Sequence, residues 1–138
     1  MPPDAVALYA IVILLLPMLC FFLSSPAFLL VGLEVPEVSQ LLRGLFNGYF
    51  LAMGVAGLVS MLLFGVAGRP VFGVGAIAIA AFGIAVRRWL LQRFDAGLQA
   101  RDAGAVTAVR QLRDLHVKAM LLNAFPLVAT VTSVPFVV

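Results

Sequence analysis

One long apolar stretch decides the fold of this chain: residues 5–33 read AVALYAIVILLLPMLCFFLSSPAFLLVGL and contain no charged side chain. A helix rises about 1.5 Å per residue and needs roughly 20 apolar residues to cross a bilayer core, so this stretch can span it. Of the 138 residues, 64% are hydrophobic and 11% are charged, and the mean hydropathy is +1.16. A soluble domain is about half apolar and about a quarter charged. We therefore expect an integral membrane protein.

Polar breaks divide the rest of the chain into three further apolar helices. Residues 34–37 (EVPE) form the first break, because proline and a carboxylate favour the first turn of a helix. Residues 68–70 (GRP) form a tight turn that only an antiparallel pair of helices can use. The sequence predicts an all-α integral membrane protein, with four transmembrane helices in one antiparallel bundle over residues 1–138. The predicted spans are 5–25, 45–67, 71–87 and 117–138.

The segment between the last two spans differs in composition. Residues 87–118 hold seven of the nine basic residues and three of the six acidic residues. Apolar residues recur here at intervals of three and four, for example Leu91, Phe94 and Leu98, which is the spacing of an amphipathic helix. We expect helices three and four to continue beyond the bilayer as an amphipathic hairpin over 88–116, with its turn between Gly97 and Gly104.

The distribution of positive charge predicts the orientation in the membrane. Lys and Arg residues near the ends of spans stay on the cytoplasmic side. With the hairpin in the cytoplasm, eight basic residues lie inside and only Arg69 lies outside. The first helix is expected to be retained, because no Lys or Arg precedes the apolar stretch. We predict a multi-pass protein of the bacterial inner membrane with a cytoplasmic hairpin and both termini in the periplasm.

A small residue occurs at every fourth position of the second helix. Helices in lipid gain little from hydrophobic burial, so close backbone contact through small residues supplies their association. This stripe predicts a helix–helix interface, either with the third helix of the same chain, which is also rich in Gly and Ala, or with another subunit. The helix-packing residues are Gly44, Gly48, Ala52, Ala56 and Ser60.

Ionisable side chains are nearly missing from the predicted spans. No Asp, Glu, Lys, Arg or His occurs in residues 5–33, 45–67 or 71–86. Ionisable groups inside a membrane mark ion pathways and proton relays, so their scarcity argues against a charge-coupled transporter. The sequence also has no Cys-x-x-Cys pair, phosphate-binding glycine loop or serine elbow. We expect no enzyme activity, no metal site and no cofactor.

One polar group stands near the start of the fourth span. His116 is the single histidine, and Met120 and Asn123 follow it one and two turns later on the same helical face. Imidazole and thioether groups can bind haem iron, chlorophyll magnesium or soft metals. A lone histidine more often makes hydrogen bonds within the fold. We interpret the three residues as a polar site at the membrane interface, with a haem- or chlorophyll-binding site through His116 as the alternative.

The basic residues of the hairpin are candidates for contact with lipid head groups or with a partner protein. Anionic head groups attract clusters of Lys and Arg beside a membrane. Nucleic-acid binding is not expected, because acidic and apolar residues alternate with the basic ones and no aromatic platform accompanies them. The candidate contact residues are Arg87, Arg88, Arg93, Arg110, Arg113 and Lys118.

Three short motifs connect the chain with a known family. They are residues 110–116 (RQLRDLH) followed by 120–123 (MLLN), residues 26–29 (PAFL), and residues 44–46 (GLF) followed by Tyr49. In these motifs the chain resembles a bacterial family of four-helix membrane proteins of unknown function, similar to the eukaryotic transmembrane protein 205. The resemblance covers most of the chain and implies the four-helix topology but no activity. Where the family often has Ser three residues after the histidine, this chain has Ala119.

These observations lead to three hypotheses of function. The first is a non-catalytic accessory or structural subunit that packs against other integral membrane subunits of a larger complex, for which respiratory and photosynthetic complexes are natural hosts. The second is a small-molecule carrier or resistance protein that acts as an oligomer. The third is a cofactor-binding protein that uses His116. The carrier would need a polar cavity, and the residues that could line it are Asn47, Ser60, Asn123, Thr130, Thr132 and Ser133.

Overall fold

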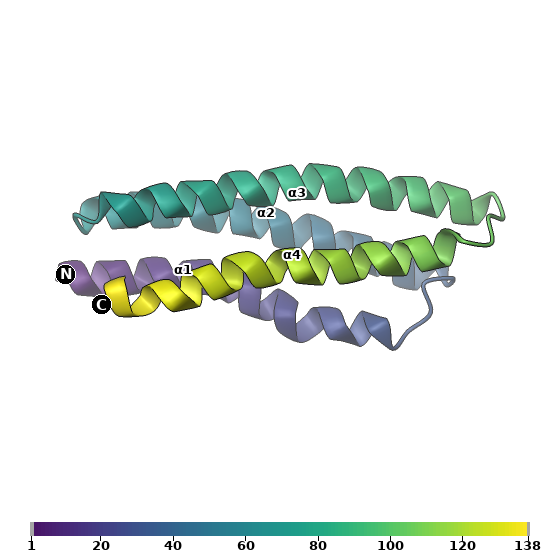
Figure 1. Ribbon diagram of the computed structural model, residues 1–138, viewed down its shortest axis with the longest axis horizontal. Coiled ribbons are helices and arrows are strands. Elements are labelled where there is room, and N and C mark those ends of the chain that lie inside the picture. The colour runs from purple at the N-terminus through teal and green to yellow at the C-terminus, as the bar shows by residue number, and fades with distance from the viewer. Residues whose placement is uncertain (1, 138) are drawn as a thin grey trace.

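The computed structural model describes residues 2–137 and is entirely helical or irregular in this range. Four long helices pack antiparallel in chain order (Figure 1). All four are long and apolar enough to cross a membrane. The predicted fold class is confirmed, and the protein is built as a multi-pass membrane protein. The elements are α1 Pro3–Ser24, the 3-10 helix η1 Ser25–Leu29, α2 Pro36–Val66, α3 Pro70–Asp102 and α4 Ala108–Val137.

The antiparallel order gives the bundle two distinct ends. The N-terminus, the C-terminus and the α2–α3 turn lie together at one end, which we call the termini end (Figure 1). The connection from η1 to α2 and the α3–α4 turn lie at the other, which we call the hairpin end (Figure 1). Which end faces the cytoplasm, and where the membrane boundary falls along each helix, stay predictions.

A glycine in the left-handed conformation closes each tight turn between helices. Gly68 follows α2 with a φ of +69°, and Gly104 follows α3 with a φ of +84°. Glycine adopts this conformation without the steric cost that a side chain imposes. The next residue then donates its N–H to a carbonyl five residues earlier, Arg69 to Phe64 at 2.8 Å and Ala105 to Ala100 at 2.9 Å. These bonds satisfy carbonyl groups at the helix ends.

The first helix ends where Ser25 precedes Pro26. Proline has no N–H to donate and its ring crowds the preceding turn, so the α-helix stops and the chain tightens into η1. The Ser24 hydroxyl donates to the Cys20 carbonyl at 2.7 Å and reinforces the last turn of α1. The chain that follows the first helix is therefore η1, which runs along the hairpin end (Figure 1).

The α3–α4 hairpin turns later than the sequence predicted. α3 continues through Gly97 to Asp102, and the turn occupies residues 103–107. Gly97 is a packing position, because a Cβ atom there would lie 2.7 Å from Cδ2 of Leu112 on α4. The missing side chain lets the two helices approach each other, and the turn conformation comes from Gly104 alone.

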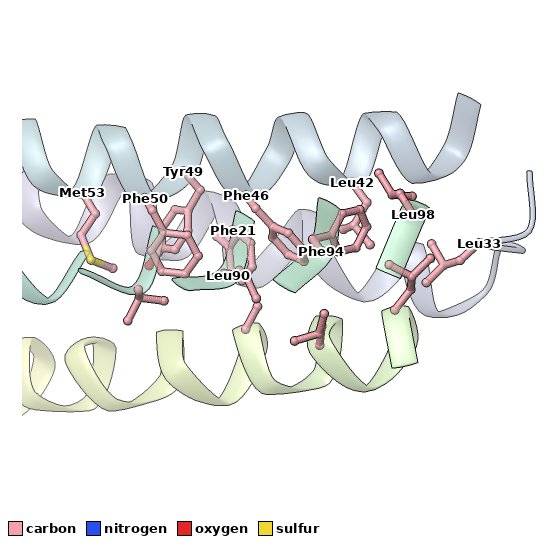
Figure 2. Close-up of a cluster of buried hydrophobic side chains, with 14 of the residues drawn as sticks. Phe21, Leu33, Leu42, Phe46, Tyr49, Phe50, Met53, Leu90, Phe94 and Leu98 are labelled. Carbon is pink, nitrogen blue, oxygen red and sulfur yellow. The ribbon is translucent and has the colours of Figure 1, made fainter. Parts of the chain in front are cut away.

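The hydrophobic core extends from the middle of the bundle into the hairpin end. Figure 2 shows side chains of α2 turned toward those of α1 and α3 along this length. Phe46 and Phe94 meet edge to face with 5.5 Å between ring centroids. Hydrogen bonds connect the hairpin to η1 and to the start of α2, so the hairpin is part of the bundle. The labelled core residues are Phe21, Leu33, Leu42, Phe46, Tyr49, Phe50, Met53, Leu90, Phe94 and Leu98.

Glycine and alanine let α2 and α3 approach closely nearer the termini end. A Cβ atom on Gly57 would lie 2.7 Å from the Ala76 carbonyl oxygen and 2.8 Å from the Ala80 Cβ atom. A Cβ atom on Gly83 would lie 3.4 Å from the Phe50 carbonyl oxygen. Small residues at these positions allow the backbones themselves to touch, which is how helices gain contact in lipid.

Candidate functional site: a groove between α1 and α2

An open apolar groove of about 850 Å³ lies between α1 and α2. Its walls carry almost no polar groups, and many of its residues are exposed on the outside of the bundle. In a membrane protein such a surface faces either lipid or another hydrophobic helix. The main contributions are Ile13, Leu16, Pro17 and Cys20 from α1 and Gly44, Gly48, Ala52, Val55 and Val59 from α2.

The predicted small-residue stripe divides between this groove and the bundle core. Gly44, Gly48 and Ala52 are exposed in the groove. Ala56 also borders the groove but is buried, and the buried Ser60 donates to the Ala10 carbonyl at 2.9 Å. A helix turns about 100° per residue, so a four-residue repeat rotates about 40° per step and about 160° over the stripe. Five such residues cannot face one helix. The close α2–α3 approach uses Gly57 instead, and a packing partner for the exposed three stays a prediction.

The two glycines of the groove have open space where a side chain would be. Within the described chain, no heavy atom lies within 4 Å of a Cβ atom built on Gly44 or Gly48. Glycine inside a helix costs about 0.5–1 kcal/mol relative to alanine, and no contact within the bundle offsets it here. By contrast, a Cβ atom would meet another atom at 3.4 Å or less on Gly54, Gly57, Gly73, Gly83 and Gly97.

His116 is fully buried at the hairpin end of the bundle. Its Nε2 atom lies 2.8 Å from the Ser25 hydroxyl oxygen, at the start of η1. The rings of Phe28 and Phe46 flank the imidazole, at 6.2 and 6.0 Å between ring centroids. Nδ1 has no hydrogen-bond partner among the residues that the structure describes. The Ser25 contact connects α4 to the start of η1, and the haem- or chlorophyll-binding alternative stays a prediction.

Asn123 connects three helices in the interior. The Tyr49 hydroxyl of α2 donates to Oδ1 of Asn123, and Nδ2 of Asn123 donates to the Met18 carbonyl of α1 at 3.4 Å. Met120 is partly buried against the core between these polar groups. The predicted polar site therefore contains two separate contacts, one at His116 and one at Asn123.

The partners Ser25 and Tyr49 were not predicted from the sequence. A signal existed for Tyr49, because a tyrosine inside an apolar span must find a hydrogen-bond partner for its hydroxyl when it is buried. Ser25 gave a weaker signal as one of two serines before a proline. Nothing in the sequence indicates which of the two faces the interior.

The polar residues expected to line a carrier cavity do not meet in one place. Asn47 accepts a hydrogen bond from Nη2 of Arg87 at 2.6 Å, and Ser60 binds α1 as described above. Three hydroxyl groups of α4 donate to carbonyl groups of their own helix at 2.7–2.8 Å, those of Thr130, Thr132 and Ser133.

The predicted contact residues of the hairpin fall into two groups. Arg87 binds Asn47, and Arg113 donates to the carbonyls of Leu29 and Val31 at 2.8 and 3.0 Å. These two arginines are used by the fold. The other four are exposed: Lys118 pairs with Asp114, and within residues 2–137 no hydrogen bond or ion pair is made by the side chains of Arg88, Arg93 and Arg110.

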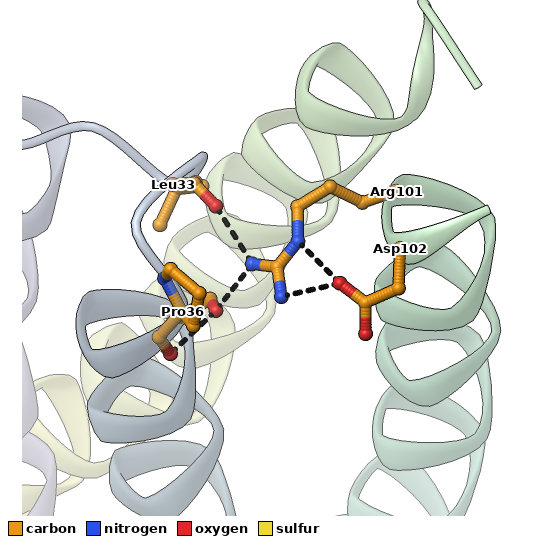
Figure 3. A network of polar contacts seen from close by, with 5 residues as sticks. Leu33, Pro36, Arg101 and Asp102 are labelled. Carbon is orange, nitrogen blue, oxygen red and sulfur yellow. Dashed lines mark hydrogen bonds and ion pairs between the residues drawn. The ribbon is translucent and has the colours of Figure 1, made fainter. Parts of the chain in front are cut away.

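Arg101, which the sequence did not single out, fastens the hairpin end. Its Nη1 atom donates to the Leu33 carbonyl at 3.0 Å and to the Ser39 hydroxyl at 2.6 Å. Its Nε and Nη2 atoms donate to Oδ1 of Asp102 at 3.1 and 2.9 Å (Figure 3). One guanidinium group thus joins the end of α3 to the connection before α2 and to the first turn of α2.

No protein-family model, curated protein or solved structure matches this chain. The resemblance to the bacterial four-helix family therefore stays a prediction. In the described part of the chain no group of three or more His, Cys, Asp or Glu residues is placed to hold a metal ion.

Proposed function

We propose that this protein is a non-catalytic accessory subunit of a larger membrane complex, and that a transmembrane helix of a partner subunit packs in the α1–α2 groove. The observation that carries this proposal is the exposed floor of the groove, where Gly44, Gly48 and Ala52 leave the α2 backbone uncovered. The proposal extends to the bacterial inner membrane as the location and to respiratory or photosynthetic complexes as examples of a host.

The physical support is the way in which helices associate in lipid. Lipid chains are as apolar as leucine, so association depends on close backbone packing at small residues. From Gly44 to Ala52 the floor covers about two helical turns, or about 12 Å of helix axis. The groove walls are apolar, so the occupant that fits is an apolar helix of the same membrane.

The proposed orientation follows the charge distribution. The turn at the termini end contains Arg69, and at that end Arg69 is paired with Asp4 at 2.6 Å. The other eight basic residues lie between the middle of the bundle, where Arg87 bonds Asn47, and the hairpin end. The positive-inside rule then places the hairpin end in the cytoplasm and the termini in the periplasm. A C-terminal fusion to a reporter that functions only outside the cytoplasm should be active, and a fusion to a reporter that functions only inside should be silent. The reverse result would invert the orientation.

The test of function is affinity purification from native membranes in mild detergent, followed by mass spectrometry. The unmodified protein should co-purify in fixed stoichiometry with one larger complex. Gly48→Leu combined with Ala52→Leu fills the floor of the groove and should abolish this association. Gly75→Leu is the matched control, because a Cβ atom on Gly75 also meets no heavy atom of the described chain but the residue lies on the exposed side of α3.

Two outcomes would contradict the proposal. If the unmodified protein is recovered alone, no complex contains it under these conditions and the carrier hypothesis gains weight. If the groove variant and Gly75→Leu retain the partner equally, the groove is not the contact surface.

A further inference from the structure

A second, smaller groove lies between α3 and α4 at the hairpin end. It has a volume of about 340 Å³ and is separate from the α1–α2 groove. Gly97 and Leu115 contribute to its lining. Four polar side chains surround it, those of Arg93, Gln111, Asp114 and Lys118.

The charges of this groove do not cancel. Nζ of Lys118 lies 2.7 Å from Oδ2 of Asp114, which neutralises one of the two cations. The Arg93 guanidinium has no carboxylate partner in the described chain and lies with Cζ 6.0 Å from the ring centroid of Trp89. The groove therefore carries one net positive charge beside an amide that can donate a hydrogen bond.

The fold does not require these cations. Arg43, Arg87, Arg101 and Arg113 each bind side chains or carbonyls of other helices or connections. Arg93 and Lys118 make no contact of this kind and are exposed. Arg110 is also exposed but does not line the groove.

The groove lies where the predicted spans end. α3 leaves its span near residue 87 and α4 enters its span near residue 117, so Trp89, Arg93 and Lys118 fall at the interface between membrane and water. Tryptophan is enriched at this depth. On both helices the same faces continue toward the membrane centre as apolar surface. Below the groove, Phe82 and Phe125 approach each other with 6.4 Å between ring centroids, and Phe125 is 73% exposed.

We propose that this groove binds the phosphate group of an anionic phospholipid. Arg93 supplies the uncompensated charge for a phosphodiester that carries one negative charge. Lys118, which is paired with Asp114, and Gln111 supply further hydrogen-bond donors. The acyl chains lie along the exposed apolar face that includes Phe125. A free phosphate ion would use the polar groups but not this apolar surface, so the geometry favours the lipid.

The experiment measures lipid binding to the purified, delipidated protein by native mass spectrometry. The probes are phosphatidylglycerol, phosphatidylcholine with the same acyl chains, and inorganic phosphate. Phosphatidylglycerol should bind more tightly than phosphatidylcholine. Arg93→Gln and Lys118→Gln should each weaken this binding about fivefold, the effect of about 1 kcal/mol per basic residue at a membrane surface. Arg110→Gln removes the same charge outside the groove and should leave binding within twofold.

Each alternative outcome overturns the proposal. If Arg110→Gln weakens phosphatidylglycerol binding as much as Arg93→Gln does, the lipid is attracted by the overall positive charge of the hairpin and not by this groove. Equal affinity for inorganic phosphate would mean a free-anion site, and equal affinity for phosphatidylcholine would mean no selection for charge. Co-purification with a partner complex is measured separately and uses the other groove, so this proposal and the proposed function can fail independently.

Discussion

Polar side chains inside the bundle are few, and they connect different helices. Tyr49 and Asn123 join α2 to α4, Ser25 and His116 join η1 to α4, and Ser60 joins α2 to α1. Such bonds give modest energy in a membrane, because polar groups of an unfolded segment also find partners there. Their greater effect is to fix which faces of the helices meet, since an unpaired polar group in an apolar interior is costly.

At this scale the first prediction concerns Tyr49. Tyr49→Phe removes the hydroxyl that donates to Asn123, keeps the ring stacked on Phe21 at 4.2 Å, and leaves Oδ1 of Asn123 unpaired. We expect the free energy of unfolding to fall by about 1 kcal/mol. The measurement is reversible unfolding in mixed detergent micelles. Tyr9→Phe is the control, because Tyr9 is 56% exposed, and its unfolding curve should match that of the unmodified protein.

The second prediction separates two adjacent serines. Ser25→Ala leaves Nε2 of His116 without its partner, in a ring whose Nδ1 is already unpaired within the described chain. Stability should fall by about 1–2 kcal/mol. Ser24→Ala removes only an exposed bond to a carbonyl of the same helix and should change stability by less than about 0.5 kcal/mol. Equal effects of the two substitutions would show that the histidine contact contributes nothing.

One face of a helix in this bundle packs against its neighbours and another is exposed, and α2 shows both. One face meets α3 through Gly57, and the other presents Gly44, Gly48 and Ala52 to the groove. Glycine therefore has two different roles on one helix. At Gly57 a side chain is excluded by atoms of α3, and at Gly44 nothing within the described bundle excludes it.

The third prediction follows from this difference. Gly57→Ala places a Cβ atom 2.7 Å from the Ala76 carbonyl oxygen, so α2 and α3 must separate and stability should fall by about 1–3 kcal/mol. Gly44→Ala adds a methyl group in open space and should leave the isolated protein unchanged or up to about 1 kcal/mol more stable. Thermal unfolding of the detergent-solubilised protein measures both. Destabilisation by Gly44→Ala would mean that the groove closes in solution.

The whole molecule is fastened by arginines at both of its ends. At the termini end Arg69 pairs with Asp4 and donates to the Phe136 carbonyl at 3.4 Å, which brings the beginning and end of the chain to the α2–α3 turn. At the hairpin end Arg101 and Arg113 bind carbonyls of the segment that connects α1 to α2. Between these ends the contacts are mostly apolar.

The fourth prediction tests the fastening at the hairpin end. Arg101→Ala removes the donors to Leu33 and Ser39, and its side chain is only 11% exposed in the folded protein. We expect backbone amides of residues 30–35 to exchange hydrogen at least about tenfold faster, because hydrogen bonds to a charged group contribute about 1.5–3 kcal/mol. Exchange in the middle of α2 should not change. Arg110→Ala is the control, and equal acceleration in both variants would refute the assigned role.

Much of the fold could be predicted from the sequence because lipid imposes simple rules. An apolar stretch such as residues 5–33 predicts a helix, since a helix satisfies its backbone groups without leaving the segment, and α1 covers this stretch as far as Ser24. The GRP turn at residues 68–70 then forces an antiparallel neighbour. The sequence alone does not show that Gly97 is a packing position, because a glycine can serve a turn or a close contact, and only the position of Leu112 shows which one applies.

The candidate site could be predicted only in part. The sequence shows the small residues of α2, but a four-residue repeat drifts around the helix, so their division between groove and core depends on how α2 is rotated in the bundle. The partners of His116 and Asn123 lie 91 and 74 residues away in the sequence. Periodicity within one helix carries no information about contacts at that distance.

The position of Cys20 makes the α1–α2 groove observable. It is the only cysteine in the chain, it is exposed, and it lines this groove beside Pro17 and opposite Gly48 and Ala52. A thiol-reactive spin label or fluorophore would therefore attach at this single site, and no other cysteine has to be removed first. The mobility of the label and the rate of labelling would report whether the groove is occupied. Cys20 can therefore be used to detect the proposed packing of a partner helix in the groove.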